Sequence, residues 1–192
     1  MKLINLKTDF LGRNFVFYKK IDSTQSEIWR LVKNGNIKNG SLIMSEIQTK
    51  GKGTHGKKWY TDESDNIAFS FYVNTECEIK QLDKITIEIA NTIVEIIKEK
   101  YNIDLKVKEP NDITIDGKKI GGILTESRIN NEKVKFLVIG IGLNTSKMNF
   151  NNDIKDLATS IKKEYGIDIN RLEFVSDFCN EFEKKIKRRI NL

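Results

Sequence analysis

The 192-residue sequence contains one histidine, two cysteines and one proline. Cys77 and Cys179 are isolated, without a CxxC pattern or companion histidines, which argues against a structural zinc site and a disulfide scaffold. The longest apolar stretch, residues 136–143, is too short to cross a bilayer. Residues 1–13 lack a hydrophobic segment followed by a small-residue cleavage site. We therefore expect a cytoplasmic protein that is neither exported nor inserted in a membrane.

The composition is that of a globular chain with an excess of positive charge. Charged residues make up 31% and hydrophobic residues 39%, and the formal net charge is +6. A basic chain suits nucleic acid, an acidic protein or a polyphosphate ligand. Much of the charge near residues 184–189 is explained by a solvated helix end that complements the helix dipole. Because no groove-reading motif is present, we do not expect DNA as a partner.

Hydrophobic periodicity and turn residues predict an α+β fold in one domain, with an antiparallel or mixed sheet backed by helices. Asp116-Gly117 and Asn130-Asn131 are typical of hairpin turns. Strands are expected at residues 15–18, 41–47, 67–73, 105–107 and 134–141, and in a hairpin over residues 113–126. Helices are expected from the cap at residues 22–24 to Asn34-Gly35, over 82–101, around 154–164, and from Asn170.

The segment QTKGKGTHGKKW, residues 48–59, interleaves three glycines with lysines and ends at Trp59. Glycine permits positive φ and close approach of the backbone to a ligand, and the lysines add charge suited to phosphate. The indole offers a flat face on which a ring can stack. The spacing is neither a Walker A motif nor a dinucleotide fingerprint, so a flexible surface loop is the alternative interpretation.

Two further segments interrupt strands with glycine. In KEPNDITIDGKKIGG, residues 108–122, Pro110 favours an extended residue before it, and the side chains of Lys118 and Lys119 point to opposite faces of the returning strand. One lysine is expected to face solvent and the other to enter a cleft, where its ammonium is buried. In VIGIGLNTS, residues 138–146, Asn144 follows two glycines where the strand emerges. Glycine within a strand indicates that a ligand or a neighbouring element packs directly on the backbone.

Together with IDST at residues 21–24, these segments resemble the catalytic domain of biotin–protein ligases over residues 15–146. The family's usual forms are a DST start, a QTxGRGRxGRxW loop, a KWPND…GKKxxGIL hairpin and a GxGxN strand. The resemblance implies a mixed, largely antiparallel sheet backed by helices, of the class II aminoacyl-tRNA synthetase and biotin synthetase type. Lipoate ligases share the fold, but their arginine-pair and glycine-run signature is not found.

The resemblance implies that biotin and MgATP form biotinyl-5′-AMP, and that biotin then passes to a lysine of a biotin carboxyl carrier protein. By position, the catalytic residue is Lys119. The biotin-binding residues are Ser23, Thr24, Gln25, Gln48, Gly51, Lys52, Gly53, Thr54 and Gly122. The ATP-binding residues are Lys57, Trp59, Asn111, Asp112 and Asn144. Mg²⁺ is expected to arrive with ATP, without a metal site held by the protein alone.

The sequence departs from the family pattern in the glycine-lysine loop. Thr54 stands where the family has a second arginine that helps to retain the adenylate, and Lys52 and Lys57 replace arginines. Lysine lacks the bidentate phosphate contact of arginine, so weaker retention of the intermediate is expected. Glu109 also replaces the usual tryptophan, and His55 is either a compensating cation or an exposed loop residue.

Residues 1–192 are interpreted as one catalytic domain, without the helix-turn-helix region or the small C-terminal β-barrel of some relatives. A non-catalytic domain that holds biotin or its adenylate is the alternative from another functional class. A lipoate-type ligase of the same superfamily is a further alternative. The sequence leaves the carrier protein unnamed, and it leaves open whether an exposed edge strand pairs two copies into a homodimer.

Overall fold

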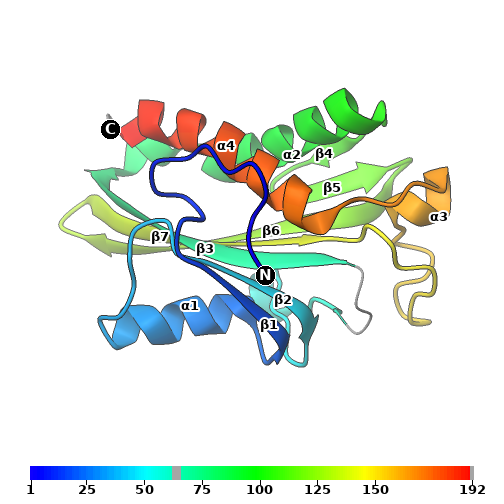
Figure 1. Cartoon of the computed structure of the whole chain (residues 1–192), viewed down its shortest axis with the longest axis horizontal. Coiled ribbons are helices and arrows are strands. Elements are labelled where there is room, and N and C mark those ends of the chain that lie inside the picture. Colours follow the sequence, from blue (N-terminus) through cyan, green and yellow to red (C-terminus); the bar gives the residue numbers. More distant parts are fainter. Residues whose placement is uncertain (62–65, 191–192) are drawn as a thin grey trace.

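A central sheet organises the computed structural model, which describes residues 1–61 and 66–190 (Figure 1). Within this part, seven strands lie in the order β1-β2-β3-β7-β6-β5-β4. β1 and β2 are parallel, and the other neighbours are antiparallel. The predicted mixed, largely antiparallel sheet is therefore confirmed. The strands are β1 (Phe15–Ile21), β2 (Leu42–Gln48), β3 (Ile67–Glu78), β4 (Lys106–Lys108), β5 (Asp112–Ile115), β6 (Lys118–Asn130) and β7 (Lys133–Leu143).

Helices cover both faces of the sheet but do so unequally. α2 and α4 lie across one face, and α1 lies against the other (Figure 1). The helices are α1 (Thr24–Lys33), α2 (Ile85–Tyr101), α3 (Ile161–Tyr165) and α4 (Arg171–Ile190), with short 3₁₀ helices at Thr54–Gly56 and Ile79–Leu82. This arrangement is the α+β architecture expected from the sequence.

Local sequence signals place several of these boundaries. The Ser23 side chain caps α1 by accepting a hydrogen bond from the Ser26 backbone N–H, and α1 ends at Asn34 as expected. Asp116 and Gly117, both at positive φ, form the tight turn between β5 and β6. A turn with two left-handed residues matches the twist of the paired strands, which explains the aspartate-glycine pair.

The main core lies between the sheet and the α2–α4 layer. Phe69 and Phe71 of β3 pack against Phe178 of α4, with ring centroids 5.6 and 5.8 Å apart. Phe182, one turn further along α4, stacks on Phe178 at 5.4 Å. All four side chains are buried. The core under α1 is smaller, and its fully buried members are Ile28, Ile43 and Val138.

Two sequence predictions need correction. The expected helix over residues 154–164 is wrong in extent, because only Ile161–Tyr165 is helical. Residues 157–159 instead pair with the start of β6: the Lys119 N–H donates to the Leu157 carbonyl, and the Thr159 N–H donates to the Lys119 carbonyl. The second hairpin turns one residue later than expected, since Asn130 still pairs with Lys133 and the turn residues are Asn131 and Glu132.

Candidate active site

A cavity of about 460 Å³ opens on the α1 face of the sheet, and all three motif segments contribute to its wall. Its size falls within the range of small-molecule sites. The loop of residues 51–59, hereafter the flap, forms one side, and β6 and β7 form the floor. The predicted site residues that line it are Ser23, Thr24, Gln25, Gln48, Lys52, Gly53, Thr54, Lys57, Trp59, Asn111, Asp112, Lys119, Gly122 and Asn144. Gly51 does not line the cavity but shapes the flap.

The flap folds back on itself as a small antiparallel loop. The Trp59 N–H donates to the Gly51 carbonyl at 3.0 Å, and the Gly53 N–H donates to the Lys57 carbonyl at 2.8 Å. A side chain at Gly51 would place its Cβ 2.3 Å from the Trp59 carbonyl oxygen, so this close approach requires glycine. At the tip, His55 has φ 54° and is exposed outside the cavity. The flap therefore directs Trp59 inward and His55 outward.

Glycines on neighbouring strands make the cavity floor. Gly122 of β6 pairs with Gly142 of β7, and Gly140 lies two residues away on the same face. A Cβ at Gly142 would lie 2.2 Å from the Trp59 indole, and a Cβ at Gly122 would lie 3.2 Å from the Lys119 ammonium. The expectation that these strand glycines mark direct packing on the backbone is confirmed, and the packed groups belong to the flap and to the catalytic candidate.

One end of the cavity, hereafter the closed end, is lined by buried polar side chains. Both the backbone N–H and the hydroxyl of Thr24 donate to Gln48 Oε1, at 2.8 and 3.1 Å. The Thr24 hydroxyl also lies 2.8 Å from the hydroxyl of Ser70, a buried residue of β3. Ser23, at the start of α1, is buried beside them. The sequence placed three of these side chains together but did not indicate Ser70, which no motif contains.

The other end carries an ion pair between Lys119 and Asp112, with Nζ and Oδ1 2.5 Å apart. Lys119 lines the cavity whereas Lys118 is exposed outside it, as the alternation of the strand predicts. The expected burial of the Lys119 ammonium is wrong, since 37% of its side chain is exposed. Its Nζ lies 5.9 Å from the Trp59 ring centroid, within cation–π range.

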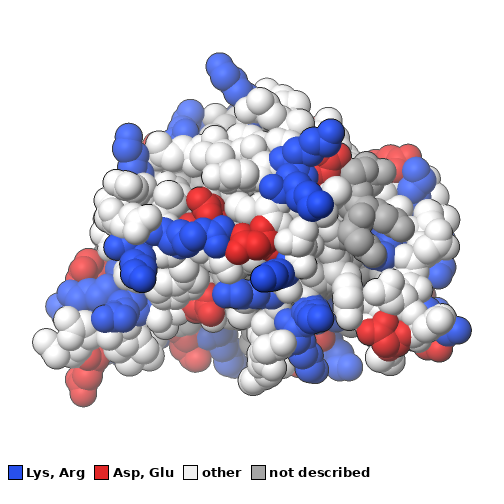
Figure 2. All heavy atoms as spheres, turned by 90° about the horizontal axis from the view of Figure 1, so that it is seen from below, with Lys and Arg blue, Asp and Glu red and all other residues white. Residues whose placement is uncertain are grey.

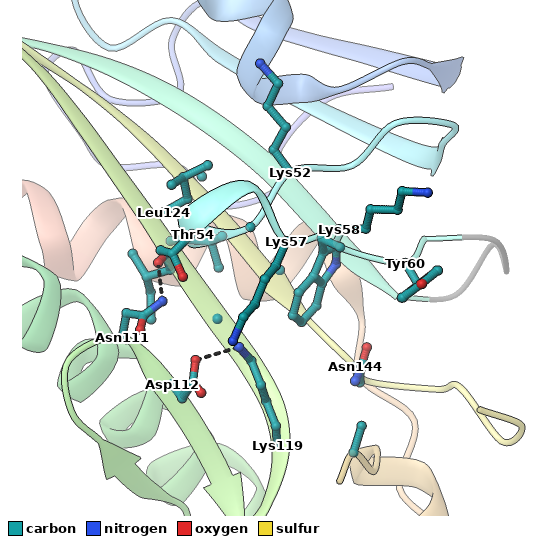
Figure 3. A pocket seen from close by; sticks show the side chains of 18 of the residues that line it. Lys52, Thr54, Lys57, Lys58, Tyr60, Asn111, Asp112, Lys119, Leu124 and Asn144 are labelled. Carbon is teal, nitrogen blue, oxygen red and sulfur yellow. Dashed lines mark hydrogen bonds and ion pairs between the residues drawn. The ribbon is translucent and has the colours of Figure 1, made fainter. Parts of the chain in front are cut away.

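Two asparagines are fixed by the backbone near this end. Asn111 donates its side-chain amide to the Ile123 carbonyl at 3.0 Å, and Asn144 donates its own to the Thr159 carbonyl at 3.2 Å. Each amide thereby keeps its oxygen available as an acceptor. Figure 3 shows Lys57 extending from the flap toward the Asp112–Lys119 pair, while Lys52 points away from it.

The cavity wall is strongly positive. Six lysines line it: Lys52, Lys57, Lys58, Lys108, Lys119 and Lys147. Asp112 is the one carboxylate in the wall among residues 1–61 and 66–190. Such an imbalance concentrates anions in a cleft. The end that carries Lys119 and Asp112, hereafter the open end, is therefore suited to a ligand with several negative charges.

The motifs did not indicate part of this wall. Lys147 is buried, with its Nζ 5.7 Å from the Phe150 ring centroid, and Lys163 approaches the same ring at 5.5 Å. Tyr60, Ile154, Leu157 and Ala158 also line the cavity. These residues follow or flank the motifs without a repeating pattern, so only their tertiary placement identifies them.

The described residues form neither a cluster of metal ligands nor a membrane-spanning helix. Over 1–61 and 66–190, no group of three or more His, Cys, Asp or Glu side chains is arranged to hold a metal ion. In the same ranges, no helix combines the length and the apolar character that a membrane span requires. Figure 2 shows that Lys and Arg side chains are spread over the α1 face with Asp and Glu among them.

Comparison with known sequences identifies relatives. Residues 17–144 match the biotin/lipoate A/B protein ligase family. The bifunctional ligase/repressor BirA of Bacillus subtilis is 31% identical over 184 residues, covering 95% of this chain and 56% of the relative. The BirA of Escherichia coli is 26% identical over 151 residues, covering 79% of this chain and 46% of the relative. The chain thus spans about half the length of these curated relatives.

Solved structures give the same relationship. The biotin protein ligase from Aquifex aeolicus in complex with biotin and ATP matches with a TM-score of 0.73 and 30% identity, over 93% of this chain and 71% of that one. The biotin acetyl coenzyme A carboxylase synthetase of Helicobacter pylori, with bound biotinylated ATP, shares the fold with a TM-score of 0.67 at 23% identity. The resemblance seen in the motifs is confirmed, and the chain belongs to the biotin/lipoate A/B protein ligase family.

Proposed function

We propose that this chain carries the catalytic domain of an ATP-dependent biotin–protein ligase. The observation that supports this most directly is one cavity with a closed polar end, a glycine floor and a lysine-rich open end, with Lys119 lining it. A small bicyclic ring fits the first two features, and a triphosphate fits the third. The Aquifex relative is named for its complex with biotin and ATP, the two ligands of this proposal.

In this proposal the closed end holds biotin. Thr24, Gln25 and Gln48 offer polar contacts to the ureido ring, Ser23 lies beside them, and Gly122 lets the ring approach the floor. The flap residues Gly51, Lys52, Gly53 and Thr54 close over biotin and the adenylate. Flap closure would exclude water from a reactive mixed anhydride and so limit its hydrolysis.

The open end holds the nucleotide. Lys57 lies toward the phosphates, Trp59 offers its ring to the adenine, and Asn111, Asp112 and Asn144 supply polar groups around the nucleotide. Mg²⁺ would arrive bound to the triphosphate and neutralise part of its charge. The oxygens of Asp112 and Asn111 are the hard ligands available there, which fits a metal carried by the nucleotide.

The first chemical step joins two anions. A carboxylate oxygen of biotin bonds to the α-phosphorus of ATP while the bond from that phosphorus to the pyrophosphate oxygen breaks. The ammonium of Lys119 would stabilise the charge that develops between them more strongly than it stabilises either reactant. In the second step the amine of a carrier lysine bonds to the biotinyl carbonyl carbon, AMP leaves, and the amine loses a proton.

The wider assignments follow from the same proposal. Residues 1–192 act as one catalytic domain, the protein partner is a biotin carboxyl carrier protein, and the reaction takes place in the cytoplasm. Neither DNA nor a membrane is required by this chemistry.

The test is pyrophosphate release by the purified chain with biotin and ATP, followed by mass analysis for biotinyl-5′-AMP. We expect release that depends on both substrates and an adenylate of the biotinyl mass. Turnover with lipoate in place of biotin would reassign the chain to the lipoate branch of the family. Tight binding of biotin without pyrophosphate release would indicate a non-catalytic binding domain.

A further inference from the structure

Glu126 of β6 lies outside the cavity wall, yet it holds a residue of that wall in place. Its Oε2 accepts hydrogen bonds from the Gln25 amide Nε2 at 2.8 Å and from the Trp29 indole Nε1 at 2.6 Å. Gln25 Nε2 also donates to the Val138 carbonyl at 3.1 Å. Trp29 is itself packed edge-on against Phe136, with ring centroids 5.6 Å apart. The carboxylate therefore ties α1 to β6 through two donors.

These contacts determine which atom of Gln25 faces the cavity. Both partners of the amide nitrogen are acceptors, so the reversed amide would place its oxygen against a carboxylate and a carbonyl. The oxygen Oε1 must consequently point the other way. It lies over Gly140, where an added Cβ would come 2.7 Å from Oε1 and 3.2 Å from the Ser70 hydroxyl.

The oriented oxygen has no partner of its own. Gln25 is 2% exposed, and Oε1 has no hydrogen-bond partner among residues 1–61 and 66–190. A buried acceptor without a donor is costly to a folded protein, so such a group calls for an explanation. Gln25 lines the cavity beside Thr24, Gln48 and Ser70, which places its oxygen at the closed polar end.

We infer that Glu126, supported by Trp29, is a positioning residue that presents the Gln25 carbonyl oxygen to a ligand N–H. The ligand class at this end of the cavity is thereby a ring with an N–H donor, such as a cyclic urea. The inference rests on the proposed function, in which biotin supplies that ring. Glu126 acts through Gln25 and touches no reacting atom.

The test compares Glu126→Leu, Glu126→Gln and Trp29→Phe by calorimetry with biotin and, separately, with ATP. Glu126→Leu removes the acceptor, and we expect biotin to bind about tenfold more weakly, as for loss of one well-oriented hydrogen bond, with ATP binding unchanged. Glu126→Gln keeps an oxygen that both donors can share, so its biotin affinity should stay within about threefold of the wild type. Trp29→Phe keeps the ring and removes one donor, and its effect should lie between the two.

An analogue of biotin methylated on its ureido nitrogens gives a readout that a purely structural role would not change. The wild type should prefer biotin over this analogue. Glu126→Leu should lose about tenfold of that preference, since a misoriented Gln25 amide no longer accepts a hydrogen bond from the ligand N–H. Equal weakening of biotin, analogue and ATP, together with a lower melting temperature, would overturn the inference. So would unchanged discrimination in Glu126→Leu.

Failure of the proposed function can be told apart from failure of this inference. In ligand-free protein, the Gln25 side-chain amide and the Trp29 indole N–H give NMR signals that report on their bonds to Glu126. If the wild type binds no biotin, the proposed function fails. The orienting role of Glu126 then stands only if Glu126→Leu releases the restrained Gln25 amide, and it falls if that signal is unchanged.

Discussion

The two faces of the central sheet are built from alternate residues of the same strands, and they differ in what those residues are. On the α2–α4 face, β3 presents Phe69 and Phe71 to the phenylalanines of α4. On the other face, β3 presents Ser70, which pairs in register with Gly140 of β7. One face is filled by side chains, while the other leaves a hollow floored by backbone. Stability and ligand binding are thus separated within a single strand by its period of two.

The largest effect should come from removing an aromatic ring on the filled face. Phe178→Ala takes away a buried ring that contacts Phe69, Phe71 and Phe182, and it should lower the free energy of unfolding by about 3–5 kcal/mol. Urea denaturation measures this loss. If the faces are independent, biotin and ATP affinities of the folded variant should match the wild type. A parallel loss of affinity would show that the faces are coupled.

The complementary substitution removes a side chain from the cavity on the other face of the sheet. Lys119→Ala should slow formation of biotinyl-5′-AMP by about two to three orders of magnitude, as for loss of one preorganised charge contact, with little change in stability. The matched control is Lys118→Ala, one residue earlier on β6 with its side chain outside the cavity. Single-turnover pyrophosphate release separates the two variants. An undiminished rate in Lys119→Ala would remove the catalytic assignment.

Most elements of the fold could be predicted from the sequence because their signals are local. The Ser23 cap and the Asp116-Gly117 turn depend on neighbouring residues only, and both occur as expected. The site was predictable to a similar degree because its motifs are contiguous in the chain. Gly122 and Gly142 illustrate this: glycine in a strand indicated direct packing, although not that Trp59 would be the packed group.

The unpredicted features depend on contacts between distant segments. Residues 157–159 are not helical because their backbone groups bond to Lys119 of β6, and the Ile161 N–H bonds to the Asn144 carbonyl. No pattern within residues 154–164 encodes those partners. Ser70 and Glu126 were missed for the same reason, since each bonds to an α1 side chain that is distant in the sequence.

Replacing a buried carboxylate in the α2–α4 layer should have a smaller effect on the free energy of unfolding. Glu183 of α4 accepts hydrogen bonds from the backbone N–H groups of Asp9, Phe10 and Leu11 at 2.6–3.0 Å. Glu183→Gln weakens this cluster and should lower the free energy of unfolding by about 1–3 kcal/mol at neutral pH. Denaturation of both proteins measures the difference, and biotin affinity should be unchanged.

The effect of Glu183 on stability depends on pH in a defined direction. Burial raises the pKa of Glu183, but the three N–H donors and Lys187 outweigh it, and the net pKa is lowered. The stabilisation is therefore complete above the unfolded pKa of about 4.3 and is lost as pH falls through the lower folded pKa. The difference in unfolding free energy between the wild type and Glu183→Gln should therefore become smaller on acidification. A difference that grows on acidification would contradict the lowered pKa of Glu183 in the folded protein.

A substitution in the flap provides a similar test on the face of the sheet that carries the cavity. Thr54 lines the cavity where the family pattern has an arginine, and Thr54→Arg should slow release of biotinyl-5′-AMP by about tenfold, the effect of one charge-assisted hydrogen bond. Release is measured by chasing preformed adenylate with excess biotin and ATP. The unfolding free energy should not change, because the flap contributes no core residue. Equal release rates would show that Thr54 is not the cause of weak retention.

The smallest effect is expected from an exposed ion pair at the junction of β1 and α1. Arg30 donates to both oxygens of Asp22, at 2.8 and 2.7 Å, and these bonds lower the pKa of Asp22 to about 2. Because both side chains are more than a third exposed, Asp22→Asn should cost only about 0.5–1 kcal/mol at pH 7. That contribution is present above the unfolded pKa of about 3.9 and is lost as pH falls toward 2, so the unfolding free energies of the two proteins should converge in acid.

The control is Asp104→Asn, whose ion pair with Lys98 is far more exposed and should contribute nothing measurable. Since the Asp22 carbonyl also accepts the Lys50 N–H just before the flap, a weaker affinity for biotin in Asp22→Asn would show that this junction also supports the flap.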